Sequence, residues 1–395
     1  ASLVRSGGFF IYTMMMMGIY PIARVIAYKI EANIYEKKEA ERKAEYTIDL
    51  GNADTEIKAY ISRQRELLKK EFLPTEQVIK LAKAKGKHPR LWYRTDAAVD
   101  FLGLRMGIFD GVPTFPILVP KDADEVDLKD PLLKEAKKLK ARFQVLTQIP
   151  YLLKLKEMGS VAILGANNLR YGLTHHLLLE ILAHHRPDEV EVYVLSTHGN
   201  ADKLWGWLRW LPHCKVFDDD KVFDHLIFGS QAIKIFLGRF ESYINKNQHK
   251  AHQVFIVDVD GLQQFDDDFV EELLANTTAW NISFLFVGGG QLPRSVRGVV
   301  HFKKQGRKAL FVDTKVDTKN IEEKEYHTHI KLDRFPSIEE CETVARSLAG
   351  IKLLGSSGGE LLRSNVSLFD VLDLGEDDKL THDDVRRNWA YGVDQ

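Results

Sequence analysis

Cysteine is scarce in this chain of 395 residues, and neither sign of charge is in excess. The two cysteines, Cys214 and Cys341, cannot form a disulfide framework, and two thiols suit a reducing cytosol. The 55 basic residues nearly cancel the 56 acidic ones, so the overall charge points neither to nucleic acid nor to an acidic partner. The length suggests two or three folded units.

Charge is missing altogether between Arg5 and Arg24. This run approaches the roughly 20 apolar residues that cross a bilayer core, and aromatic residues lie toward its ends, as interfacial anchors would. We therefore expect a transmembrane helix over residues 1–28, with a buried core helix and a membrane-surface helix as alternatives. Lysine and arginine are frequent after Arg24, which places the bulk of the chain in the cytoplasm at the cell membrane.

The rest of the chain divides by composition. Residues 29–89 are charged and then carry an apolar stripe at helical spacing, which predicts a helical stalk. Residues 90–125 have short apolar runs broken by glycine and proline, which predicts a small β-rich lead-in. Residues 126–355 alternate between strand and helix patterns, and residues 356–395 are acidic and loosely patterned, as in a linker that leads onward.

Continuous apolar strands that alternate with helices are typical of an α/β fold, and here they predict a P-loop NTPase-like, mostly parallel sheet flanked by helices. The expected strands are 151–155, 160–164, 190–195, 254–257, 284–287 and 308–312. The expected helices are 173–185, 201–210, 224–245 and 267–277.

The stretch "SVAILGANNLRYGLTHH" joins an apolar strand to Gly165 and then to a helical pattern, as a phosphate-binding loop does, but it contains no lysine. A loop of the form G-x-x-x-x-G-K-[S/T] would place its second glycine, its lysine and its hydroxyl where the chain has Arg170, Tyr171 and Gly172. The dinucleotide pattern G-x-G-x-x-G also fails, because Ala166 and Asn167 follow Gly165.

A second candidate element is "QVFIVDVDG", in which an apolar strand ends at Asp258, as a strand that holds a metal-bound nucleotide would. The next residue is Val259, where a carboxylate that polarises water would be expected, and Asp260 projects to the other face of an extended strand. Without a lysine or a well-placed base, ATP hydrolysis lacks both main sources of transition-state stabilisation.

Two interpretations of this site follow. In the first, Gly165, Asn167, Asn168 and Arg170 bind nucleotide weakly at a helix N-terminus beside Asp258, with ATP and Mg²⁺ as ligands. In the second, the domain is structural and holds no firm cofactor. The absent lysine favours the second interpretation, because it removes the strongest fixed charge of such a site.

Other clusters have structural explanations. Trp205, Trp207 and Trp210 are expected to fill a core beside the sheet. His175, His176, His184 and His185 lack the spacing of three or four that places two zinc ligands on one helix face. The basic runs "KKEAERK" and "KEAKKLKAR" contain acidic or apolar residues and no stacking aromatics, so they suit solvated helix faces or anionic lipid headgroups better than nucleic acid.

Several ordered motifs together resemble the EccC/EssC-type membrane ATPases of type VII secretion, in the FtsK/SpoIIIE group. They are "RLWYRTDAAVDFLGLRMG", "AILGANNLRYGLTHHLLLEIL", "LWGWLRWLPHC", "FIVDVDG", "FVGGGQLPRSV" and "SLFDVLDL". In the first motif the residues that match are Arg90, Leu91, Trp92, Arg94, Asp100, Phe101, Leu102, Leu104, Arg105 and Gly107, whereas Tyr93 replaces a glutamate. Gln291 and Pro293 match a sensor motif of related motors.

The resemblance implies the second membrane helix, the stalk and the degenerate, FtsK-like membrane-proximal ATPase domain (residues 126–355) of a hexameric motor that faces the cytosol. It also implies that residues 356–395 are a linker towards a missing ATPase module. It implies other membrane-complex subunits as partners, and secreted WXG-type substrates that are handled by later modules. On this basis we expect a pseudo-ATPase segment that couples the membrane channel to downstream ATPase modules. The alternatives are an active or regulatory ATP-binding domain of the same motor and a DNA translocase segment.

Overall fold

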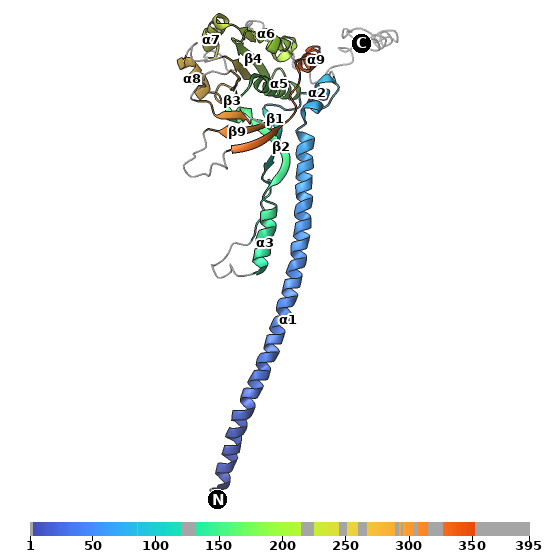
Figure 1. Cartoon of the computed structure of the whole chain (residues 1–395), viewed down its shortest axis with the longest axis vertical. Coiled ribbons are helices and arrows are strands. Elements are labelled where there is room, and N and C mark those ends of the chain that lie inside the picture. Colours follow the sequence, from blue (N-terminus) through green and yellow to red (C-terminus); the bar gives the residue numbers. More distant parts are fainter. Residues whose placement is uncertain are drawn as a thin grey trace, which may run out of the picture.

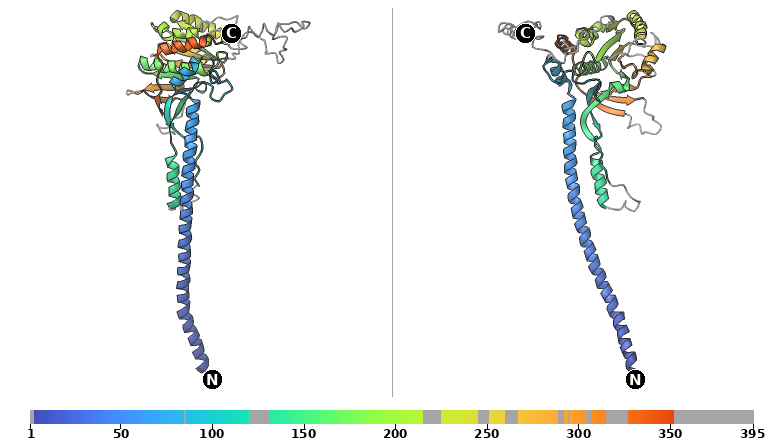
Figure 2. Two further views of the ribbon diagram at one scale, coloured as in Figure 1. Left: turned by 90° about the vertical axis from the view of Figure 1, so that its right-hand side faces the viewer. Right: turned by 180° about the vertical axis from the view of Figure 1, so that it is seen from behind.

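The computed structural model describes residues 3–84, 86–119, 131–214, 225–244, 251–259, 267–288, 292–293, 295–303, 307–314 and 327–351. A globular α/β body stands at one end of a single long helix, and the shorter helix α3 lies beside that helix (Figures 1 and 2). The N-terminus lies at the far end of the long helix, and the described chain ends in the globular body.

The α-helices are α1 (Leu3–Glu71), α2 (Thr75–Lys83), α3 (Pro131–Arg142), α4 (Leu155–Met158), α5 (Asn167–His184), α6 (Ala201–Trp205), α7 (Ser230–Ile244), α8 (Asp267–Ala275) and α9 (Ile338–Ala349). Two 3₁₀ turns, η2 (Gly206–Trp210) and η3 (Pro212–Cys214), follow α6. The strands are β1 (Gly103–Gly111), β2 (Leu146–Lys154), β3 (Ser160–Leu164), β4 (Val190–Ser196), β5 (Leu226–Phe228), β6 (His252–Asp258), β7 (Ile282–Phe286), β8 (Gly298–Phe302), β9 (Lys308–Asp313) and β10 (His327–Leu332).

All ten strands form one sheet in the order β2-β1-β10-β9-β8-β3-β7-β6-β4-β5. The six strands from β8 to β5 pair in parallel, whereas β2, β1, β10, β9 and β8 pair antiparallel. The parallel half confirms the α/β sheet that the continuous apolar strands predict. Since carboxyl ends of parallel strands meet at one edge, β3 and β6 bring Gly165 and Asp258 to the same side of the sheet.

The parallel strands are buried on both faces, and alternate residues enter different cores. Val192, Val194 and Ile256 pack with α5, α2 and α9 on one face. Tyr193 and Phe255 pack with α7 and α8 on the other face, where their rings stack at 4.9 Å. A third cluster, around Ile61, Phe143, Leu146 and Ile149, packs the C-terminal part of α1 against α3 and β2.

The uncharged segment near the N-terminus forms the first part of α1. Among the described residues no helix is both long enough and apolar enough to cross a membrane, so the transmembrane helix expected over residues 1–28 stays a prediction.

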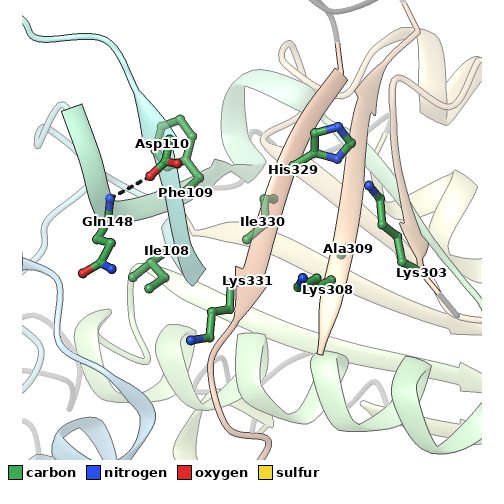
Figure 3. A pocket seen from close by; sticks show the side chains of 10 residues that line it. All are labelled: Ile108, Phe109, Asp110, Gln148, Lys303, Lys308, Ala309, His329, Ile330 and Lys331. Atoms are coloured by element: carbon green, nitrogen blue, oxygen red, sulfur yellow. Dashed lines mark hydrogen bonds between the residues drawn. The ribbon is translucent and has the colours of Figure 1, made fainter. Parts of the chain in front are cut away.

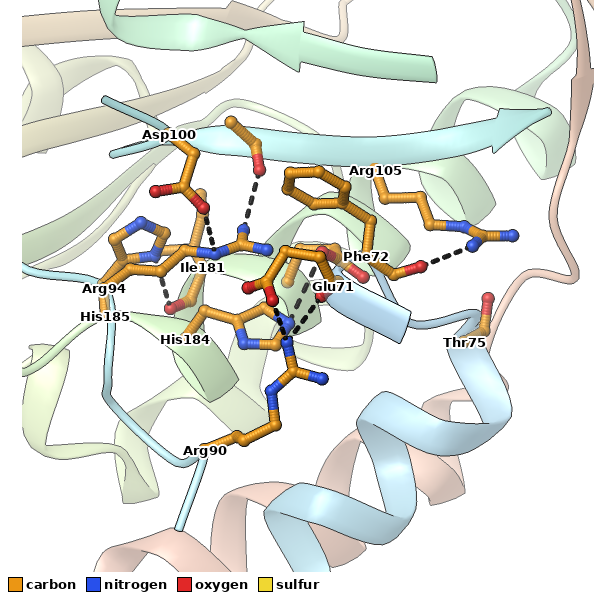
Figure 4. A network of polar contacts seen from close by, with 12 residues as sticks. Glu71, Phe72, Thr75, Arg90, Arg94, Asp100, Arg105, Ile181, His184 and His185 are labelled. Carbon is orange, nitrogen blue, oxygen red and sulfur yellow. Dashed lines mark hydrogen bonds and ion pairs between the residues drawn. The ribbon is translucent and has the colours of Figure 1, made fainter. Parts of the chain in front are cut away.

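Arginines hold the C-terminal end of α1 against the globular body (Figure 4). Arg90 donates from Nη1 to the Lys70 carbonyl at 2.5 Å and from Nη2 to the Glu71 carbonyl at 2.9 Å. Arg105 donates to the Phe72 carbonyl at 2.6 Å. The last carbonyls of a helix have no partner within the helix and carry its negative dipole end, so guanidinium groups are suited to satisfy them.

Arg105 and a third arginine, Arg94, also bind groups of the globular body. Arg105 forms a two-pronged ion pair with Asp333, at 2.6 and 3.1 Å, just beyond β10. Arg94 is buried, bonds the Gly103 carbonyl at 2.9 Å and pairs with Asp100 at 2.9 Å. We call Arg90, Arg94 and Arg105 the arginine clamp, because they join α1 to β1 and the segment before it.

Replacing the buried Arg105 by alanine should lower the free energy of unfolding by about 2–4 kcal/mol, because it leaves the half-buried carboxylate of Asp333 and the Phe72 carbonyl without their partner. Chemical denaturation followed by tryptophan fluorescence measures the change. Arg186→Ala is the matched control, because Arg186 pairs with Asp188 at 2.6 Å on the surface. That variant should lose less than about 1 kcal/mol, and equal losses in the two variants would contradict the clamp.

Candidate functional site at the carboxyl edge of the parallel strands

The loop after β3 is very short. β3 ends at Leu164 and α5 begins at Asn167, so only Gly165 and Ala166 lie between strand and helix. Gly165 has φ +152°, and a Cβ on it would lie 2.6 Å from the Phe302 ring, so glycine is required there. The residues that would wrap a phosphate are instead helical, which removes the loop whose backbone N–H groups would cradle it.

The residue in the place of the phosphate-loop lysine faces the candidate metal-side carboxylate. Tyr171 is buried in the first turns of α5, and its hydroxyl donates to Oδ1 of Asp258 at 3.0 Å. Asp258 ends β6 and is only 4% exposed. The two elements that would grip a nucleotide therefore bond directly to each other.

The second carboxylate oxygen of Asp258 is also occupied. Ser196, at the end of β4, donates to Oδ2 at 2.9 Å, and the Trp205 indole donates to the same oxygen at 3.0 Å. The Tyr171 and Trp205 rings meet edge to face at 5.8 Å. Three neutral donors thus satisfy one buried carboxylate, which is the condition for keeping such a charge in a protein interior.

The start of α5 remains open to solvent. Gly165, Asn167 and Asn168 are exposed, and no side chain caps the first turn. Arg170 is buried and donates from Nη2 to the Asn167 side chain at 2.5 Å, while its Nε has no partner among the described residues. Free N–H groups and a cation at a helix start attract anions, so this turn could hold a phosphate group weakly.

Of the expected site residues, the structure brings together Gly165, Asn167, Asn168 and Arg170 at the start of α5, with Asp258 behind them through Tyr171. Gln291 and Asp260 lie outside the described residues. The contacts of Tyr171, Ser196 and Trp205 with Asp258 were not predicted from the sequence. A tyrosine in the position of the lysine was the one available signal, because its hydroxyl can donate to a facing carboxylate.

The four histidines of the α5 region take separate structural roles. His175 donates to the Leu204 carbonyl at 3.0 Å, and His176 donates to the Arg105 carbonyl at 2.6 Å. His185 accepts from the Leu102 amide at 3.0 Å. Within the part of the chain that the structure describes, no three His, Cys, Asp or Glu side chains are grouped to hold a metal ion.

Burial shifts the pKa values of several of these groups. It lowers the pKa of His175 to about 4, although its bond to the Leu204 carbonyl acts the other way. His184 lies 3.7 Å from Glu180, and burial lowers the pKa of His184 and raises that of Glu180 to about 8. Burial therefore favours the neutral forms of His175, Glu180 and His184 in α5.

The tryptophans divide between core and surface. Trp205 and Trp207 are buried, which confirms the expected core role, and both rings contact His175. Trp210 is 47% exposed, so the expected core role is wrong for this residue. Trp210 ends the 3₁₀ turn η2, and the Arg346 guanidinium of α9 lies over its ring, 5.8 Å from the ring centroid.

The chain is an α/β domain with a ten-stranded sheet flanked by helices, in which two residues join β3 to α5. No family model matches the chain. It is 27% identical over 217 residues to the type VII secretion system protein EssC of Staphylococcus aureus strain NCTC 8325, covering 53% of this chain and 14% of EssC. It is 24% identical over 267 residues to the ESX secretion system protein EccC of Geobacillus thermodenitrificans, covering 65% of this chain and 18% of EccC.

The chain is thus homologous to the EssC and EccC proteins of type VII secretion, and it spans less than a fifth of the length of these relatives. Among solved structures, EssC (ATPases 2 and 3) from Geobacillus thermodenitrificans has a TM-score of 0.39 at 13% identity, covering 66% of this chain and 50% of the other. Thermomonospora curvata EccC (ATPases 2 and 3) has a TM-score of 0.38 at 12% identity, with the same coverage.

Replacing Asp258 by alanine should lower the free energy of unfolding by about 3 kcal/mol or more, because three buried donors lose their acceptor. Denaturant titration of the whole chain measures this loss. Asp202→Ala is the control, since Asp202 is an exposed carboxylate on α6. A loss for Asp258→Ala no larger than that of the control would show that the carboxylate is not part of a closed network.

Replacing His175 by glutamine should weaken the pH dependence of stability between about pH 4 and 6.5. The folded chain keeps this imidazole neutral down to about pH 4, whereas the unfolded chain binds its proton near pH 6.5. The free energy of unfolding therefore rises with pH across this window. In the variant, its slope against pH should be smaller by up to about 1.4 kcal/mol per pH unit. Denaturation at several pH values measures this slope, and His198→Gln is the control because His198 is half-buried. A slope in His175→Gln equal to that of the unmodified chain would contradict the prediction.

Proposed function

We propose that this chain is a coupling module of a type VII secretion motor and does not hydrolyse ATP itself. The observation that carries the proposal is the hydrogen bond from Tyr171 to Asp258, which joins the lysine position to the metal-side carboxylate. A phosphate-loop lysine supplies a positive charge to the β and γ phosphates, whereas a tyrosine hydroxyl is neutral.

The carboxylate of Asp258, which would hold a nucleotide-bound metal, is also occupied by donors of the chain. Mg²⁺ binds carboxylate oxygens and phosphates in a near-ideal octahedron. The two oxygens of Asp258 already accept from Tyr171, Ser196 and Trp205. A metal-bound nucleotide would have to displace these donors, and the two-residue loop after β3 would return few N–H groups in exchange.

The coupling part of the proposal rests on α5, which connects the site to the arginine clamp. Its first turns carry Tyr171, next to Asp258. Further along, His176 donates to the Arg105 carbonyl, and His185 accepts from the Leu102 amide. Because nearly all of the helix from Arg170 onward is buried, a displacement of α1 at the clamp is transmitted to the parallel sheet through a rigid, packed element.

Homology to EssC and EccC supports the assembly in which this module works. We propose that the globular body lies at the cytoplasmic face of the cell membrane within a hexameric motor. Its partners would be other subunits of the secretion complex, and export substrates of the WXG type would be handled by further ATPase modules. The finer position of this segment within the motor belongs to the same proposal.

A regulatory nucleotide site is the second candidate, and Arg170 favours it. Its Nε is buried without a partner among the described residues, beside an uncapped and exposed helix start. A weakly held phosphate group would satisfy both features. This candidate requires saturable binding without turnover.

The whole chain should show no Mg²⁺-dependent ATP turnover above background and no calorimetric heat with a slowly hydrolysed ATP analogue at millimolar concentration. The solved EssC fragment with ATPases 2 and 3 is the comparison protein in the same assay. Saturable turnover that Asp258→Ala abolishes would overturn the proposal. Saturable binding that Arg170→Gln weakens, without turnover, would establish the regulatory site instead.

A further inference from the structure

The antiparallel half of the sheet carries a hollow that the proposed function does not use (Figure 3). It has a volume of about 360 Å³ and lies over β1, β10, β9 and the end of β8. Its lining includes four basic side chains, Lys303, Lys308, Lys331 and His329. The one carboxylate in the lining is Asp110.

The three lysines form a row across neighbouring strands. Lys331 on β10 pairs directly with Lys308 on β9, and the Lys303 amide donates to the Lys308 carbonyl at 2.9 Å. Residues opposite each other in a sheet project to the same face, with Cβ atoms about 5 Å apart. All three lysines are exposed, and none forms an ion pair with any residue that the structure describes.

Like charges directly opposite each other destabilise a sheet. A row of three lysines therefore keeps a positive potential on this face, which an anionic partner would relieve. Asp110, whose carboxylate accepts from the Gln148 amide at 3.0 Å (Figure 3), offsets one of the three positive charges and leaves the row positive.

The edge of the hollow is held in an unusual backbone conformation. Gln148 has φ +56°, and the pairing of β1 with β2 shifts register between Phe109 and Gly111. A non-glycine residue at positive φ costs free energy, and irregularities of this kind re-aim side chains at binding sites. The bond from the Gln148 amide to Asp110 stabilises this conformation beside the lysines.

The chemistry of the hollow favours an acidic protein segment over a small phosphate compound. Phosphate sites commonly use the fork of arginine or a helix N-terminus, and neither lines this hollow. Ile108, opposite Lys331 on β1, adds an apolar surface within the same row. Lysine ammonium groups next to an apolar side chain suit a partner segment in which glutamate or aspartate alternates with aliphatic residues.

We propose that this face, the lysine row of Lys303, Lys308 and Lys331 with Ile108, docks an acidic, aliphatic-interleaved segment of a partner protein. The contact is electrostatically steered and depends on salt, because the lysines are exposed to solvent. It is independent of nucleotide chemistry at Asp258, so its test separates from that of the proposed function.

Fluorescence anisotropy of the whole chain with a labelled peptide of alternating glutamate and leucine tests the proposal. Binding should be saturable at 50 mM salt and should weaken at least tenfold at 300 mM salt. The triple variant Lys303→Gln, Lys308→Gln, Lys331→Gln should weaken it at least tenfold. The control Lys80→Gln, Lys203→Gln, Lys234→Gln removes the same charge from exposed positions on α2, α6 and α7 and should change binding less than twofold.

Carbodiimide cross-linking gives a readout that does not depend on affinity, because it joins peptide carboxylates to nearby amines, and the joined residues should be the three lysines of the row. The triple variant should keep the thermal midpoint of the unmodified chain, since it removes repulsion and no ion pair. No binding at 50 mM salt, or equal loss in both triple variants, would overturn the proposal. Full displacement of the peptide by equimolar tripolyphosphate, ATP or a single-stranded DNA oligomer would overturn it in favour of a phosphate ligand.

Discussion

The carboxylate of Asp258 is the constraint on which the organisation of the parallel sheet edge depends. A buried charge is tolerated only when donors surround it, and here the donors come from α5, from the end of β4 and from α6. Each of these segments is fixed by reaching the same two oxygen atoms. The arrangement gives the edge a rigid structure at the expense of the open coordination that a nucleotide-bound metal requires.

The arginine clamp applies the same physical rule at the other end of α5. There the groups to be satisfied are the last carbonyls of α1, and guanidinium donors supply the partners. The motif arginines Arg90, Arg94 and Arg105 therefore have a structural explanation in this chain. They bind the C-terminal end of a long helix to β1 and the segment before it.

The sequence predicted the buried parallel strands well, because a continuous apolar run between turn signals has few alternative interpretations. β3 was expected at 160–164, as found, and β4 and β6 lie within two residues of expectation. The short strand β5 lies inside an expected helix at 224–245, since three residues carry no readable period. Half of the candidate site could be predicted from residue types in sequence. The contacts of Ser196 and Trp205 with Asp258 could not, because they depend on how distant segments pack.

The continuity of α1 has a mechanical consequence. Its 69 residues form one rod, about 100 Å long at 1.5 Å per residue. Its C-terminal part packs on α3 and β2, so the rod acts as a lever: a tilt of the whole helix by about 5° displaces its far tip by about 9 Å, given that length. Small rearrangements near the sheet are thereby enlarged into motions as wide as a helix, and conversely a modest lateral pull at the tip exerts a large torque on its base.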